Sequence, residues 1–307
     1  MQPNAYFEVS RLKFTKSLFW LAVFSIAGAL IIVPFWILDP RQLGGVSVWV
    51  KPLKFLISSA IFSFTFSWLS SFITKGLRWV KILGLVITVS LSVELVIIVA
   101  MASIGKTSHF NVSSIASIVI WSLMATFISF VLISTLLLSL MILRQKEQPQ
   151  ILKLTLAFGS LNTAVGMGLA YLMTSPTAQQ LANFKGIAGA HSVGVEDGGP
   201  GLPFFGWSTV AGDLRVGHFF GLHSIQVAAI LLAASLLVPI TFRAPLVIAG
   251  NLTWLSFVGL LTWQALRAES FSSPSELTLV SFATAIATAL VVFFALWASL
   301  RRRGLSA

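Results

Sequence analysis

The chain has 307 residues, of which 57% are hydrophobic and only 9% are Asp, Glu, Lys or Arg. A soluble domain is about 45–50% apolar and about 25% charged, so this composition excludes most soluble classes and predicts a membrane protein. The net charge of +11 does not indicate nucleic-acid binding, because Lys and Arg lie in short groups between apolar runs. Without cysteine there is no disulfide or thiolate ligand, so a metal would need His, Asp or Glu.

Eight long apolar segments predict eight membrane-spanning helices, because a hydrocarbon core about 30 Å thick needs roughly 20 apolar residues of helix. The second helix is expected to begin near Lys51, with Pro52 in its first turn. We therefore expect an all-α, polytopic transmembrane helix bundle that forms a single domain over residues 1–307. The predicted spans are residues 17–38, 55–74, 79–101, 114–143, 151–173, 213–240, 244–266 and 276–300.

A long connection, residues 174–212, separates the fifth and sixth predicted helices. It is rich in Gly and Pro, which argues against another span. A connection of this length in a compact protein is usually either functional or disordered. Its aromatic residues, among them Phe204, Phe205 and Trp207, favour an ordered outer cap over a flexible linker.

The orientation follows from the distribution of basic residues, which favours the cytoplasmic side of a membrane. With both termini inside, 13 Lys and Arg residues fall in the inner segments and 7 in the outer segments. An odd number of spans would place the arginines at 301–303 opposite the N-terminal basic group. We therefore expect an even number of spans, with the N- and C-termini in the cytoplasm.

All four histidines are expected on the outer side, in loops or in the outer half of a helix. His109, His191, His218 and His223 are the candidate cofactor ligands, and His109, His218 and His223 are the candidate metal ligands. His218 and His223 are about 140° apart on a straight helix, so this pair alone is not expected to chelate an ion. The alternative for each is a structural histidine that is bonded to a backbone carbonyl or a serine.

Two acids are the candidate catalytic residues, Glu94 in the third predicted span and Asp213 at the start of the sixth. An ionisable side chain inside a membrane is a functional candidate by default. At 1.5 Å per residue, Glu94 and His223 lie about 10 and about 15 Å below the outer boundary, which are comparable depths. The alternatives are a neutral Glu94 that is bonded to Ser90, and an Asp213 that caps its helix beside Arg215.

Three outer cations, Lys51, Lys54 and Arg215, lie near predicted helix N-termini. Free N–H groups and a positive helix dipole favour anions at such ends, so these residues are candidates for binding an anionic ligand. The alternative for the two lysines is that their ammonium groups reach out to lipid headgroups.

Most of the chain from the second to the sixth predicted helix resembles a family of bacterial multi-spanning membrane proteins with no known activity. The resemblance implies a bacterial inner-membrane protein and supplies no ligand or catalytic residue. It is carried by WVKPLKF (49–55), GKTSHFN (105–111), AHSVGVEDGGPGLPFFGWST (190–209) and GDLRVGHFFGLHSIQ (212–226).

These observations favour a metal- or haem-dependent membrane enzyme or cofactor-binding protein with an outward-facing site of histidines and acids. Zinc or haem would be the cofactor. One alternative is a proton-coupled transporter or receptor for a small anionic ligand, in which Glu94 and His223 titrate. Another is an interaction protein that uses the outer loop. The expected partners are the lipid bilayer and a small-molecule or lipid ligand, with no nucleic acid.

Overall fold

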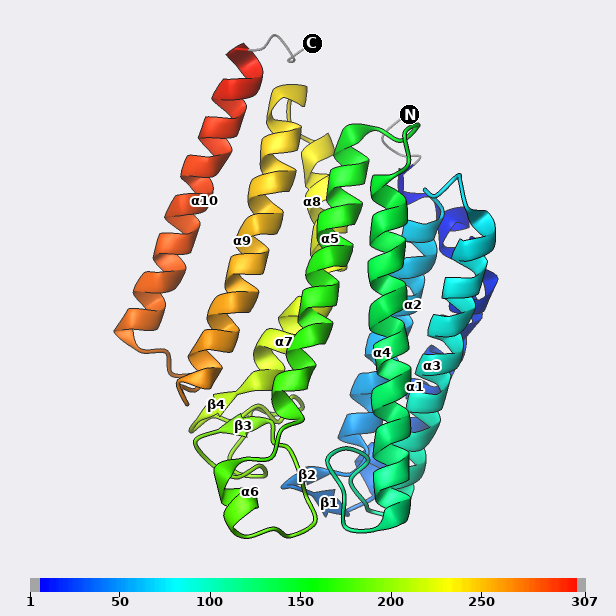
Figure 1. Ribbon diagram of the computed structural model, residues 1–307, viewed down its shortest axis with the longest axis vertical. Helices are drawn as coiled ribbons and strands as arrows, with labels where there is room; N and C mark the ends of the chain where they lie inside the picture. Colours follow the sequence, from blue (N-terminus) through cyan, green and yellow to red (C-terminus); the bar gives the residue numbers. More distant parts are fainter. Residues whose placement is uncertain (1–5, 303–307) are drawn as a thin grey trace.

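Long helices lie side by side in the computed structural model of the protein, with the larger loops gathered at one end (Figure 1). The structure describes residues 6–302. Within that range, seven helices are long and apolar enough to cross a membrane, and a bent pair of shorter helices makes an eighth span if the pair is counted as one. The predicted all-α polytopic bundle is therefore confirmed.

The first half of the chain forms the helices α1 (Lys16–Leu38), α2 (Val50–Ser70), α3 (Leu77–Ser103), α4 (Ile115–Leu143) and α5 (Gln150–Gly168). A 3-10 helix, Val9–Lys13, precedes α1, and another, Leu169–Met173, follows α5. The second half forms α6 (Ala178–Ala182), α7 (Leu214–Leu222), α8 (Ser224–Leu236), α9 (Ile240–Leu266) and α10 (Glu276–Arg302).

Both chain termini lie at the same end of the bundle, as an even number of spans requires (Figure 1). We call this the termini end, and we call the opposite end, with residues 39–49, 104–114, 174–213 and 267–275, the loop end. Of the arginines at 301–303, Arg303 lies outside the described residues.

Several helices begin where the sequence predicts. Ser114 caps α4 by accepting a hydrogen bond from the backbone N–H of Ser117. Pro52 lies in the first turn of α2, where its missing N–H removes no helical hydrogen bond. Asp213 caps α7 by accepting from the backbone N–H of Arg215.

The expectation of one continuous helix over residues 213–240 is wrong. The chain breaks at His223, and α7 and α8 meet at a bend of 47°. α5 and α7 cross closely beside the break, where a Cβ on Gly221 would lie 2.3 Å from the Cα of Gly166. At the break, the hydroxyl of Thr163 on α5 accepts the backbone N–H of Ile225.

Short antiparallel pairings organise the loop end. Strand β1 (Gln42–Leu43) pairs with β2 (Val46–Ser47), and β3 (Ser192–Val193) pairs with β4 (Gly212–Asp213). An isolated bridge joins Asn111 to Ile187. The β3–β4 pairing brings the middle of the long connection to its end, and the bridge joins this connection to the loop between α3 and α4.

Alanine in place of Gly166 should push α5 and α7 apart, because its Cβ would lie 2.2 Å from the backbone carbon of Gly221. We expect a loss of about 1–3 kcal/mol in the free energy of unfolding, measured by thermal unfolding in detergent. Gly259→Ala in α9 is the matched control, because a Cβ there meets nothing within 4 Å. Equal destabilisation of both variants would contradict this explanation.

Candidate functional site

Three of the four histidines gather near the loop end. His109 lies in the loop between α3 and α4, His191 directly precedes β3, and His218 lies in α7. The ring of Phe110 contacts both His109 and His191, with centroids 6.1 and 5.0 Å apart. His109, His191 and His218 are close enough for their charges to interact.

His109 is held by two donors. Its Nδ1 lies 3.0 Å from Lys51 Nζ and 2.9 Å from Ser108 Oγ. Because an ammonium group can only donate, Nδ1 accepts and the ring proton of the neutral histidine lies on Nε2. Burial, followed by the charges of Lys51, His191 and His218, lowers the pKa of His109 well below its usual value. His109 is therefore neutral at neutral pH.

His191 is oriented by a carboxylate that the sequence analysis did not select. Its Nδ1 lies 2.6 Å from Asp197 Oδ2, and Asp197 also accepts the backbone N–H groups of His191 and Ser192. Burial alone would raise the pKa of Asp197, but these hydrogen bonds outweigh it and lower the pKa. The ring proton therefore lies on Nδ1, and Nε2 makes no hydrogen bond to the described residues.

His218 and His223 have different surroundings. His218 Nδ1 donates to the backbone carbonyl of Gly166 at 2.7 Å, as the structural alternative proposed. His223 lies at the helix break, and its ring packs on Phe219 with centroids 4.5 Å apart. In the described part of the chain, no hydrogen bond or ion pair joins His223 to Glu94, the acid expected at a comparable depth.

Within residues 6–302, no group of three or more His, Asp or Glu side chains is arranged to hold a metal ion. The predicted set of His109, His218 and His223 therefore does not form a three-ligand group in this arrangement. His191 and His218 retain the feature typical of ligands, since an acceptor fixes each Nδ1 and leaves Nε2 available.

Asp213 and Arg215 hold the long loop in place. Arg215 makes a bidentate ion pair with Asp213, with Nη2 and Oδ2 2.5 Å apart, and it also donates to the carbonyl of Gly206. Asp213 accepts the backbone N–H groups of Ser208 and Arg215. The alternative in which Asp213 caps its helix beside Arg215 is therefore confirmed.

Lys51 and Lys54 are half-buried near the start of α2. Lys54 Nζ donates to the carbonyl of Phe205 at 2.8 Å, next to the Gly206 carbonyl that Arg215 binds. The ion pairs of the described residues include neither lysine. Both ammonium groups thus contact neutral acceptors and lack a carboxylate partner in residues 6–302.

Glu94 is buried, with 5% of its surface exposed, and Lys51 is the charged residue with which it interacts electrostatically. Its Oε1 has no hydrogen-bond partner among the described residues. The alternative of a neutral Glu94 requires a side-chain hydrogen bond to Ser90, and the described residues contain no such bond. Glu94 is therefore a buried acid that interacts electrostatically with Lys51 and forms no ion pair among the described residues.

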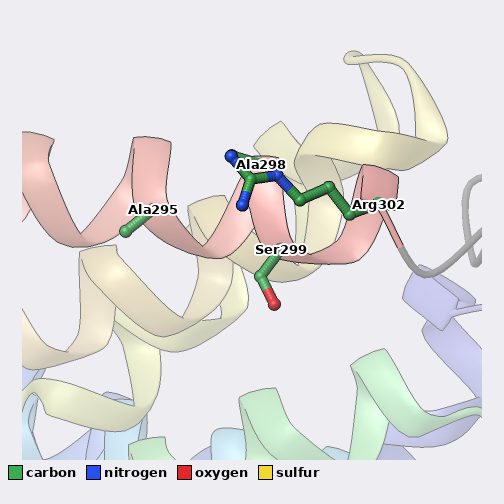
Figure 2. Close-up of a pocket in the computed structure, with 4 residues that line it drawn as sticks. All are labelled: Ala295, Ala298, Ser299 and Arg302. Atoms are coloured by element: carbon green, nitrogen blue, oxygen red, sulfur yellow. The ribbon is translucent and has the colours of Figure 1, made fainter.

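An open depression on α10 is lined by Ala295, Ala298, Ser299 and Arg302 (Figure 2). It lies near the termini end and contains none of the candidate residues. A narrow crevice at the loop end is lined by Asp213, Glu269 and Phe271 among others. The polar groups that could bind a ligand are thus concentrated at the loop end.

Comparisons of the chain with protein-family profiles, with curated proteins and with solved structures found no match. The resemblance to a bacterial membrane protein family stays a prediction.

The stability of the protein should fall as the pH is lowered from about 7 to about 5, because burial lowers the pKa values of His109 and His191 from a usual value of about 6.5. Such groups contribute stability that is fully present above the unfolded pKa and is lost as the pH falls through the folded pKa. Melting temperatures in detergent across this range test the prediction.

His109→Gln should make the melting temperature less dependent on pH, because glutamine does not titrate. Lys106→Gln, which changes an exposed lysine in the same loop, should keep the wild-type dependence. If His109→Gln melted with the wild-type pH dependence, His109 would not be the titrating group.

Proposed function

We propose that this multi-pass membrane protein binds a small oxyanion at its loop end, between Lys51, Lys54 and Arg215, and acts as a transporter or receptor for it. The observation that carries the proposal is the pair of half-buried ammonium groups without a carboxylate partner among the described residues. Removing an unpaired charge from water costs several kcal/mol, and a bound anion would offset that cost.

The local charge balance supports this proposal. Asp213 neutralises Arg215 directly, whereas Glu94 offsets Lys51 only through space. The backbone N–H groups at the start of α2 add positive potential, because the N-terminal end of a helix carries partial positive charge. The site therefore carries excess positive charge in a bundle that is otherwise poor in charged residues.

The long loop would serve as a lid. Lys54 and Arg215 bind the adjacent carbonyls of Phe205 and Gly206, which lie beside the aromatic cluster of Trp207 and Phe219. An ammonium group has three donors, so Lys54 can bind an anion while it keeps its bond to the loop.

We also infer that the loop end faces away from the cytoplasm, with both termini cytoplasmic, in a bacterial inner membrane. The 13 basic residues assigned to the inner segments against 7 in the outer segments support this orientation. The anion would then be captured from outside the cytoplasm.

Titration calorimetry of the purified protein with inorganic phosphate tests the proposed site. Lys51→Gln and Lys54→Gln should each weaken binding by about 10- to 100-fold, as expected when a hydrogen bond to a charged group worth about 1.5–3 kcal/mol is lost. Lys106→Gln, an exposed lysine at the same end, should bind normally. Phosphate binding that is unchanged in both Lys51→Gln and Lys54→Gln would refute the site.

The phosphate could be free or part of a lipid headgroup. Native mass spectrometry after delipidation separates these sources, because a retained phospholipid would be lost in Lys51→Gln if its headgroup occupied the site. Competition between inorganic phosphate and phosphatidylglycerol for the wild-type protein would show that both use the same cations.

A cofactor-dependent enzyme is the second candidate, favoured by the free Nε2 atoms of His191 and His218. Zinc would supply an activated water, and haem would supply redox chemistry. If this candidate is right, the purified protein should contain near-stoichiometric metal or show a haem absorption band, and His218→Gln should lose it. A colourless, metal-free preparation with full phosphate binding would exclude this candidate.

A further inference from the structure

A line of buried hydroxyl groups runs between α1 and α2. Ser59, Ser63 and Ser67 are four residues apart on α2, so they share one face and follow one another in steps of about 6 Å. At the termini end, Ser67 Oγ accepts the backbone N–H of Thr15 at 3.0 Å. We call these residues, together with Ser25 of α1, the hydroxyl column.

The register of the helices places Ser25 in this line. α1 and α2 run antiparallel, and a Cβ on Gly28 would lie 3.1 Å from Leu56 Cδ2. Ser25 precedes Gly28 by three residues and Ser59 follows Leu56 by three, so each lies on the contacting face of its helix and at a similar level.

Glu94 lies at the loop side of the hydroxyl column. A Cβ on Gly84 of α3 would lie 2.6 Å from Thr15 Cγ2, which fixes the level of α3 at the termini end. Glu94 is ten residues after Gly84, so it lies about 15 Å closer to the loop end than Thr15 does. Ser59 is eight residues before Ser67, so it lies about 12 Å closer to the loop end than Thr15 does. Lys51, beyond Ser59 on α2, interacts electrostatically with Glu94.

Buried polar atoms without a partner concentrate along this line. Six such side-chain atoms occur among the described residues, and four of them are Thr15 Oγ1, Ser25 Oγ, Ser63 Oγ and Glu94 Oε1. Each of these four residues is at most 5% exposed.

Other hydroxyls in α2 and α3 bond to the carbonyl one turn back, which is the usual arrangement in an apolar helix. Ser70 donates to the carbonyl of Phe66, Thr65 to that of Ile61, and Thr88 to that of Gly84. Ser25 and Ser63 do not, so helix packing alone does not account for their hydroxyl groups. Their free donors and acceptors are available to water.

We propose that the hydroxyl column, completed by water, is a proton path between the termini end and Glu94. A hydroxyl both donates and accepts, so each oxygen can take a proton from one neighbour while its own O–H bond breaks and that proton passes to the next oxygen. The Glu94 carboxylate takes up the proton and, as the carboxylic acid, releases it to water on the loop side, because the Lys51 ammonium has no lone pair and Nδ1 of His109 is already bonded.

The charges around Glu94 are few. Lys51 faces it from α2, while residues 17–38 of α1 and residues 115–143 of α4 contain no charged side chain. If the path supplies protons to the anion site, proton movement could be coupled to anion movement. That coupling rests on the proposed anion site, whereas the proton path does not.

Proton flux into liposomes that contain the purified full chain tests the path. A trapped pH-sensitive dye reports acidification after valinomycin sets a potassium diffusion potential. Wild-type liposomes should acidify faster than protein-free liposomes. Ser63→Val, Ser25→Val and Glu94→Gln should each slow this flux about tenfold or more, which corresponds to a barrier about 1.4 kcal/mol higher.

Ser281→Val is the matched control, because Ser281 lies on α10 and its hydroxyl bonds to the carbonyl of Leu277. It should conduct like the wild type, and thermal melting verifies the fold of every variant. Normal phosphate binding with lost flux in Ser63→Val would support the path. Normal flux in a Lys54→Gln variant that no longer binds phosphate would also support a path independent of the anion site.

Wild-type flux equal to that of protein-free liposomes would overturn the proton path. Wild-type flux in both Ser63→Val and Ser25→Val would overturn it as well, because these variants change two different helices of the column. Neither result would bear on phosphate binding, so failure of the path and failure of the anion site remain distinguishable.

Discussion

A polar group inside a lipid bilayer must find its partners within the protein, and this constraint governs the whole bundle. The loop end meets it with specific contacts: Arg215 binds Asp213, Lys54 binds the Phe205 carbonyl and Lys51 binds His109. These contacts join α2 and α7 to the long loop, and α2 to the loop between α3 and α4. Two kinds of group remain unsatisfied: the lysine charges, which have no carboxylate partner among the described residues, and the hydroxyls of the column. Both functional proposals rest on these groups.

Most of the fold could be predicted from the sequence, because the thickness of a bilayer sets the length of a spanning helix and apolar runs are visible directly. The helix break could not be predicted. The residues that lie against it, Gly166 and Thr163, belong to α5, which is far away in the sequence. A glycine in a helix sequence shows that another backbone could approach it closely. Which segment does so depends on the tertiary structure.

The candidate site was predictable as a set of residue types but not as a set of contacts. The capping role of Asp213 followed from its position before a helix, and the structure shows the same bond. Asp197 was missed, because only the folded loop brings it to His191. The spacing of Ser59, Ser63 and Ser67 is visible in the sequence, but their surroundings depend on which helices α2 contacts.

The bend at His223 also has a consequence for how the chain enters the membrane during its synthesis. α7 has 9 residues and α8 has 13, so they are about 14 and about 20 Å long, and neither alone matches a hydrocarbon core of about 30 Å. The two helices are long enough to cross it only together, with the backbone N–H of Ile225 at the break bonded to a side chain. Its acceptor, Thr163, belongs to α5, which the ribosome completes earlier. The helix that supplies this acceptor is therefore synthesised before α7 and α8.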